Sequence, residues 1–159
     1  MGKRSVKENK NIYQLSRENA GLTREKAAEK LVYISDDRIE KLENEKLFPH
    51  PEEVMSMAEA YKDARLTNYY CTHECPIGMK YVPEVELADL SKITLEVIDS
   101  INQLEKEKDR LIEIAVDGRI SDDEEEDFRE IRGELDRISR AVQMLRLFIE
   151  QAALEKEEA

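Results

Sequence analysis

TREKAAEKLVYISDDRIEKLENEK, which occupies residues 23–46, decides the fold of this chain. Its apolar residues recur at helical spacing on either side of LVYIS. This predicts two short helices, over residues 23–31 and 35–44, with a tight turn between them. The inner faces of these helices are small or aliphatic: Ala27, Ala28, Leu31, Ile39 and Leu42.

Both predicted helices have clear start signals. Thr23 and Ser35 stand where a side-chain oxygen can accept a hydrogen bond from the first helical turn. Asp36 and Asp37 then place negative charge at the positive end of the second helix. Two short helices that cross through an alanine-rich contact form the core of a helix-turn-helix, so we expect that motif here.

Further helices are predicted on both sides of the motif. An amphipathic pattern over residues 11–20 ends at Gly21, a typical helix stop. The prolines of LFPHP mark a connection, and helices are expected over residues 51–62 and 64–70. Together these segments predict a five-helix domain over residues 1–68.

The pattern resembles the lambda-repressor-like helix-turn-helix domains of the XRE/Cro class of bacterial and phage transcriptional regulators. The residues that carry the resemblance are Ala20-Gly21-Leu22-Thr23, Ala27-Ala28-Glu29-Lys30-Leu31, Ser35, Ile39, Leu42-Glu43-Asn44 and Pro49. The resemblance covers about residues 10–68. It implies a module that binds double-stranded DNA, and that acts in pairs on a two-fold site.

The same resemblance implies which residues contact DNA. Arg24 and Lys46 would bind phosphates on either side of the groove, while Ser35 and Arg38 would reach base edges. The full set of expected DNA contacts is Arg24, Ser35, Arg38, Lys41, Asn44 and Lys46.

Acidic side chains on the second motif helix support a different function. Asp36, Asp37 and Glu40 are expected on its exposed side, where they would face a polyanion. The whole chain has a net charge of −12, but residues 1–50 hold 11 Lys or Arg and 9 Asp or Glu. The sequence therefore predicts a DNA-binding transcriptional regulator. The alternative is a protein–protein adaptor or antagonist that keeps the scaffold without binding DNA.

A segment with cysteine, histidine and proline follows the five-helix domain, and we expect residues 69–85 to be a linker. Cys71, His73 and Cys75 alternate within it. These three side chains could bind zinc, although a structural zinc site normally has four ligands. The two cysteines, four residues apart, could instead form a labile disulfide, or all three residues could simply pack. No cofactor other than this possible zinc is expected.

The rest of the chain, residues 86–159, predicts a long antiparallel helical hairpin. Apolar residues recur at alternating steps of three and four along both arms. The first arm has Leu90, Thr94, Val97, Ile101, Leu104, Lys108, Leu111 and Ala115, and the second has Phe128, Ile131, Leu135, Ile138, Val142, Leu145, Ile149 and Ala152. Gly118 ends the first arm, and the capping box Ser121-x-x-Glu124 starts the second.

Extra apolar residues widen the hairpin stripe toward its open end. They include Ile93, Ile98, Met144, Leu147 and Phe148. A two-helix hairpin cannot bury so wide a face alone, so we expect a second subunit or the N-terminal domain to cover it. We prefer a homodimer in which two hairpins form a four-helix bundle.

Composition limits the remaining possibilities. Charged residues make up 39% of the chain and aromatic residues 6%, which favours an all-α protein. No apolar run approaches the roughly 18 residues needed to cross a bilayer, and no signal-type segment follows the basic start. A cytoplasmic protein with no membrane association is therefore expected. The sequence carries no phosphate-binding glycine loop and no nucleophile–base pattern, so we do not expect an enzyme.

Overall fold

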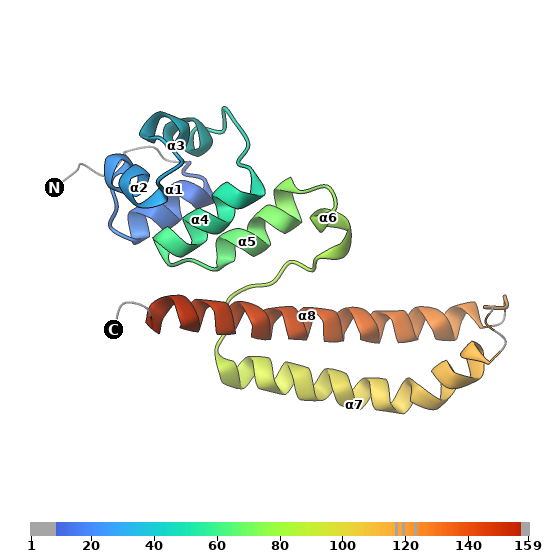
Figure 1. The fold of residues 1–159 in the computed structure, drawn as a ribbon. Helices are drawn as coiled ribbons and strands as arrows, with labels where there is room; N and C mark the ends of the chain where they lie inside the picture. Colours follow the sequence, from blue (N-terminus) through green and yellow to red (C-terminus); the bar gives the residue numbers. More distant parts are fainter. Residues whose placement is uncertain (1–8, 117, 119, 123, 157–159) are drawn as a thin grey trace. The chain divides into compact units, whose positions relative to one another are not determined.

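The computed structural model describes residues 9–116, 118, 120–122 and 124–156. Every regular element within these ranges is a helix, which confirms the predicted all-α class (Figure 1). The chain divides into two compact units. One comprises Met1–Glu84 with Ile149–Ala159, and the other comprises Val85–Phe148. No helix in the described part of the chain is long and apolar enough to cross a membrane.

The first three helices begin at the residues that the sequence indicates. Asn11 accepts a hydrogen bond from the Gln14 amide at the start of α1, Ile12–Asn19. Thr23 and Ser35 do the same for α2, Arg24–Leu31, and α3, Asp36–Glu43. Because each side-chain oxygen pairs an amide that the helix itself leaves unpaired, the capped ends are stabilised.

The next two helices complete the packing around α1–α3. Pro51 occupies the first position of α4, Pro51–Tyr61, where a missing amide hydrogen costs nothing. Lys62 then stops α4 in the left-handed region at φ 57°. Helix α5, Arg65–Tyr69, follows after a short turn.

Eleven buried apolar side chains form the core of this unit. Ala27 is fully buried on α2, and its small side chain allows α3 to approach closely. Ile39 and Leu42 project from α3 into the same core. The full set is Tyr13, Ala27, Leu31, Ile34, Ile39, Leu42, Val54, Met57, Ala58, Tyr61 and Leu66.

The segment expected to be a linker is largely helical. A π-helical turn, η1 (Tyr70–Glu74), continues from α5, and the short helix α6 (Gly78–Tyr81) packs against it. Residues 69–84 belong to the same compact unit as α1–α5. The alternating cysteine and histidine residues did not indicate these helical elements. The contacts that hold them on the five-helix core come from residues distant in the sequence.

Those contacts centre on two aromatic rings. The Tyr13 hydroxyl on α1 donates a hydrogen bond to Glu74 at 2.9 Å. The Tyr13 ring meets Tyr69 edge to face, with 6.1 Å between ring centroids. Gly78 lies directly against the backbone of Cys71 in η1. Tyr13 thus holds the segment on the five-helix core through a polar and an aromatic contact, and the close approach of Gly78 to Cys71 packs α6 on η1 within the segment.

The second long feature is the predicted helical pair. Helix α7 spans Leu90–Ala115 and α8 spans Glu125–Lys156, and the two run antiparallel (Figure 1). Asp89 caps α7 by accepting from the Lys92 amide at 2.9 Å. Between the arms, Arg110 donates to Asp127 at 2.5 Å, which aligns the two helices.

The turn between the arms contains part of the predicted capping box. The Ser121 amide donates to the Glu124 carboxylate at 3.0 Å, as a capping box requires. The Ser121 hydroxyl also donates to that carboxylate, at 2.5 Å. Asp117, Arg119 and Asp123 of this turn lie outside the described residues.

The heptad pattern of the hairpin is only half buried. One set of seam positions is buried or partly buried: Val97, Leu104, Leu111, Ile131, Ile138 and Leu145. The other set includes Ile101, Leu135 and Val142, which are exposed, and Leu90 at the start of the first set is exposed as well. Each helix of a two-helix hairpin has only one neighbouring helix. That neighbour can bury one of the two apolar heptad positions, and the other position stays exposed.

Candidate nucleic-acid interface

Helix α3 presents a polar face to solvent and an apolar face to the core. Ser35, Asp36 and Asp37 are exposed at its start, and Glu40 and Lys41 are exposed one turn later. This face therefore carries three carboxylates beside one ammonium group. Its electrostatics depend on which basic side chains lie around it and on what they bind.

A buried ion-pair cluster lies under α3. Both side chains of the Arg17–Glu43 pair are almost completely buried, with Nε–Oε1 at 2.5 Å and Nη2–Oε2 at 3.0 Å. Burial opposes the charge of Arg17, but the hydrogen bonds and charge of Glu43 outweigh it and raise the pKa of the guanidinium. The pair joins α1 to the end of α3 and fixes the orientation of α3.

Arg24, the first predicted phosphate contact, belongs to the same cluster. Its Nε donates to Glu43 at 2.8 Å, and its Nη1 lies 3.8 Å from a Glu40 oxygen. The side chain remains 31% exposed. Arg24 can therefore offer its outer edge to an anion while its Nε stays bound to Glu43.

Arg38, a predicted base contact, is bound to helix α4. Its guanidinium pairs with both carboxylate oxygens of Glu53, at 2.7 and 2.8 Å, and also donates to the Phe48 carbonyl at 3.2 Å. The hydrogen bonds from Arg38 hold the pKa of Glu53 below its ordinary value, although burial acts the other way. In this structure Arg38 connects α3 to α4, and its side chain remains 25% exposed.

The other predicted contacts lie at the ends and along the exposed side of α3. Ser35 caps the helix, and Asn44 occupies its C-terminal cap. The Lys41 ammonium pairs with Asp37, one turn earlier, at 2.6 Å on the exposed side. Lys46 is exposed just beyond the helix. The structure thus brings Ser35, Lys41 and Lys46 to the surface around α3.

Three residues that form ion pairs joining α3 to another helix were not identified from the sequence. Arg17, Glu43 and Glu53 each bind a charged side chain on another helix. Glu43 does carry a signal in the sequence, because it stands four residues after Ile39 and so falls on the core-facing side of α3. Glu53 carries none, since a glutamate in the first turn of α4 is explained by the helix dipole alone.

The cysteine segment does not gather into a metal site. Cys71 and Cys75 are not disulfide-bonded, and Cys75 Sγ accepts from the Gly78 amide at 3.4 Å. The His73 ring stacks on Tyr69 with 4.3 Å between ring centroids, and its Nε2 lies 3.4 Å from Glu84. Among the residues that the structure describes, no three His, Cys, Asp or Glu side chains are placed to hold a metal ion.

The Cys71 thiol is also not activated. Burial, together with the neighbouring Cys75, raises the pKa of Cys71. A raised pKa lowers the thiolate fraction that metal binding and disulfide exchange require. In this structure Cys71 and Cys75 are partly buried and the His73 ring stacks on Tyr69, as the packing alternative expects.

The five predicted dimerisation residues are placed differently from one another. Ile93, Met144 and Leu147 are buried within a single chain, and Phe148 is partly buried. Ile98 alone remains exposed, at 51%. The widened stripe was expected to need covering, but three of its five residues are already covered without a second subunit.

No family model, curated protein or solved structure matches the chain.

Proposed function

We propose that this protein is a DNA-binding transcriptional regulator similar to the XRE/Cro class, and that it acts as a dimer. The observation that carries the proposal is the way in which α3 is packed and oriented in the structure. Ala27 lets it pack closely on α2, the Arg17–Glu43 pair fixes its orientation, and its polar side faces solvent. A short, capped helix held in this way is what insertion into a major groove requires.

The exposed groups offer contacts of two kinds. Lys46 and the outer edge of Arg24 lie near the ends of the motif, where phosphates flank a groove-bound helix. The Lys41 ammonium can leave Asp37 and bind a phosphate instead, because an exposed ion pair contributes little stability. Asp36 and Glu40 can accept hydrogen bonds from cytosine amino groups.

A second candidate function has its own support. Arg24, Arg38 and Lys41 each bind a carboxylate of this chain, so part of the positive charge expected for DNA is already neutralised. The exposed side of α3 is consequently acidic. A helix of this kind suits a basic protein surface, as in an adaptor or antagonist.

DNA binding at low salt tests the proposal, using mixed-sequence duplexes and the DNA adjoining the gene. The variant Lys41→Glu/Lys46→Glu should weaken binding, and it should reduce the slope of log affinity against log salt by about two, one for each phosphate contact. Lys80→Glu on α6 is the matched control, because Lys80 is exposed in the same unit but lies outside the motif. It should lower affinity much less.

The variant Asp36→Asn/Asp37→Asn separates the two functions. Removing two negative charges should increase non-specific affinity if α3 faces phosphates. If the parent shows no binding at low salt, the regulator proposal fails. Loss of a co-purifying basic protein in this variant would then support the adaptor.

A further inference from the structure

The strongest unexplained surface of the described chain is an apolar face on the hairpin. Its members recur at heptad-related positions on both arms, and each is between 41% and 57% exposed. We define the outer apolar face as Ile98, Ile101, Ile112, Leu135 and Val142. A different set of residues fills the inner seam between the two arms: Val97, Leu104, Leu111, Ile131, Ile138 and Leu145.

Helix geometry places the two halves of this face on the same side. Each α-helical residue advances about 100° around the axis. On α7, Ile101 lies roughly a quarter turn from the inner seam, and on α8 Leu135 lies roughly a quarter turn in the same rotational sense. Because the arms run antiparallel, equal rotation brings both stripes to one side of the hairpin.

We propose that the outer apolar face binds the same face of a second copy of this chain, forming a four-helix bundle around a two-fold axis parallel to the hairpin. This deepens the dimer half of the proposed function and does not depend on DNA binding. A heptad stripe on two adjacent helices is the surface that another helical pair fits. Such an axis places α7 of one copy against α8 of the other.

The charged residues at the edges of the outer apolar face support a second copy of this chain as its binding partner. Arg110 and Asp127 bind one another across the hairpin. Glu105 lies five residues before Arg110, and Arg132 lies five residues after Asp127. The antiparallel arms therefore carry Glu105 and Arg132 at the same height along the hairpin.

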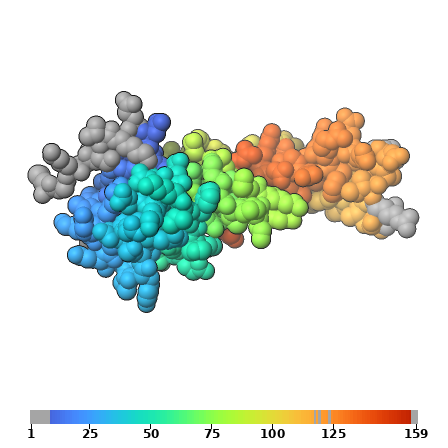
Figure 2. Space-filling view, turned by 90° about the horizontal axis from the view of Figure 1, so that it is seen from above, coloured from blue at the N-terminus to red at the C-terminus, as the bar shows by residue number. Residues whose placement is uncertain are grey.

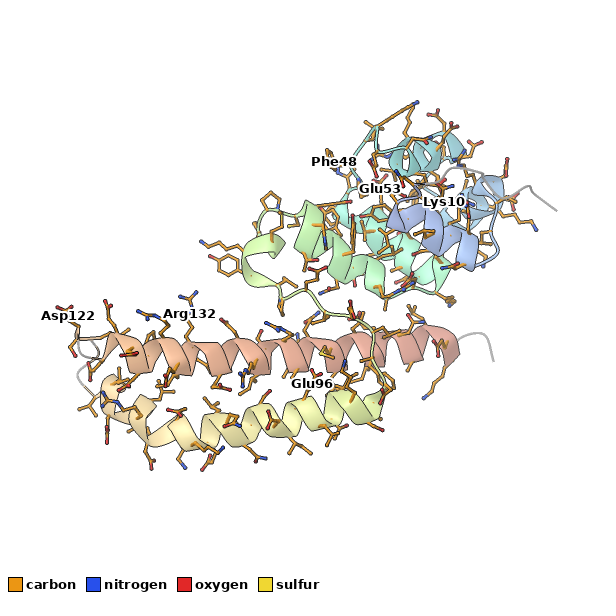
Figure 3. The ribbon with its side chains drawn as sticks, turned by 180° about the vertical axis from the view of Figure 1, so that it is seen from behind. Lys10, Phe48, Glu53, Glu96, Asp122 and Arg132 are labelled. Carbon is orange, nitrogen blue, oxygen red and sulfur yellow. The ribbon has the colours of Figure 1, made fainter. Side chains whose placement is uncertain are left out.

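Both side chains stand at the outer edges of their helices. Glu105 is exposed, although it accepts from Lys108 at 2.5 Å, and Arg132 lies on the side of α8 away from α7 (Figure 3). In the proposed bundle Glu105 of each copy faces the partner's Arg132, so one pairing occurs twice. The face is complementary to itself in charge as well as in apolar character.

The apolar part of the proposal is tested by light scattering on the full chain. The parent should have twice the mass of the 18.5 kDa monomer. Val142→Arg should give a monomer with unchanged helix content by circular dichroism, because Val142 is exposed in the single chain. Leu95→Arg is the matched control: Leu95 is equally apolar and 69% exposed on α7, but lies outside the face. It should leave the dimer intact.

The charge pairing is tested by reversal. Glu105→Arg and Arg132→Glu should each weaken dimerisation about tenfold, since each places like charges opposite one another twice. The double variant should restore parental affinity. A monomeric parent overturns the proposal, and so does a dimer that survives Val142→Arg. A DNA-binding monomer would overturn this inference and the dimer half of the proposed function but not DNA binding, whereas a dimer without DNA affinity would overturn only the regulator proposal.

Discussion

The Arg38 guanidinium on α3 donates hydrogen bonds to both carboxylate oxygens of Glu53 on α4, at 2.7 and 2.8 Å. Both side chains are at most a quarter exposed. A bidentate guanidinium–carboxylate pair of this kind is stronger and more directional than an ordinary surface ion pair. It explains why α3 keeps a fixed position relative to α4. It also means that a residue expected to contact DNA serves the fold.

Breaking this pair should lower stability measurably. Arg38→Gln is expected to reduce the free energy of unfolding by about 1–2 kcal/mol, because two charge-assisted hydrogen bonds are lost and Glu53 keeps a partly desolvated charge. Urea unfolding monitored by circular dichroism gives the value. Combining Arg38→Gln with Glu53→Gln completes a double-mutant cycle, and a coupling energy near zero would show that the pair contributes nothing.

The buried Glu43 should be far more sensitive. Glu43→Ala leaves Arg17 charged, almost completely buried and without its carboxylate partner, which typically costs about 3–5 kcal/mol. The midpoint of urea unfolding should fall accordingly. Arg24→Ala, which removes only the partly exposed member of the cluster, is the comparison and should cost much less. Equal losses in the two variants would contradict the assignment of Arg17 as the critical partner.

Local sequence signals predicted much of this fold. Thr23 and Ser35 cap the helices that they were expected to cap, because capping depends on residues within one turn. Ile39 and Leu42 are buried as their helical spacing indicates. The long helical pair also follows from periodicity alone. Each of these signals spans only a few residues.

The features that sequence analysis missed depend on distant residues. Glu53 is fifteen residues from Arg38, and Glu74 is sixty-one residues from Tyr13. Periodicity finds the residues that can face a neighbour, but it does not say how many neighbours exist. That is why Leu135 and Val142 were assigned to one seam although the single chain leaves them exposed.

Gly78 provides a test of how tightly the cysteine segment is packed. A Cβ at this position would lie 2.2 Å from the Cys71 carbonyl oxygen, and backbone cannot move aside easily. Gly78→Ala should therefore destabilise the protein by about 1–3 kcal/mol and increase amide exchange in η1. The measurement is thermal unfolding together with hydrogen exchange.

Gly133 is a matched control for that substitution. It lies within α8, and nothing stands within 4 Å of a Cβ added there. Gly133→Ala should increase stability by about 0.5–1 kcal/mol, because alanine favours the helix and glycine does not. If both glycine variants raise stability, the close contact between Gly78 and Cys71 is not present in solution.

Glu74 should give stability a pH dependence opposite to that of Glu53. Burial raises the pKa of Glu74 above its ordinary value of 4.5, although the Tyr13 hydroxyl acts against this. The folded state therefore holds this proton more tightly than the unfolded chain, and the resulting stabilisation is complete below pH 4.5 and lost as pH rises through the folded-state pKa. Glu74→Gln keeps an acceptor for Tyr13 without a charge. The parent should therefore lose stability relative to this variant as pH rises toward neutrality.

The pKa of Glu53 is lowered, so the parent should instead become more stable relative to the Glu53→Gln variant as pH rises through that pKa. Urea unfolding across this pH range measures both differences, and equal slopes would contradict the opposite environments of the two carboxylates.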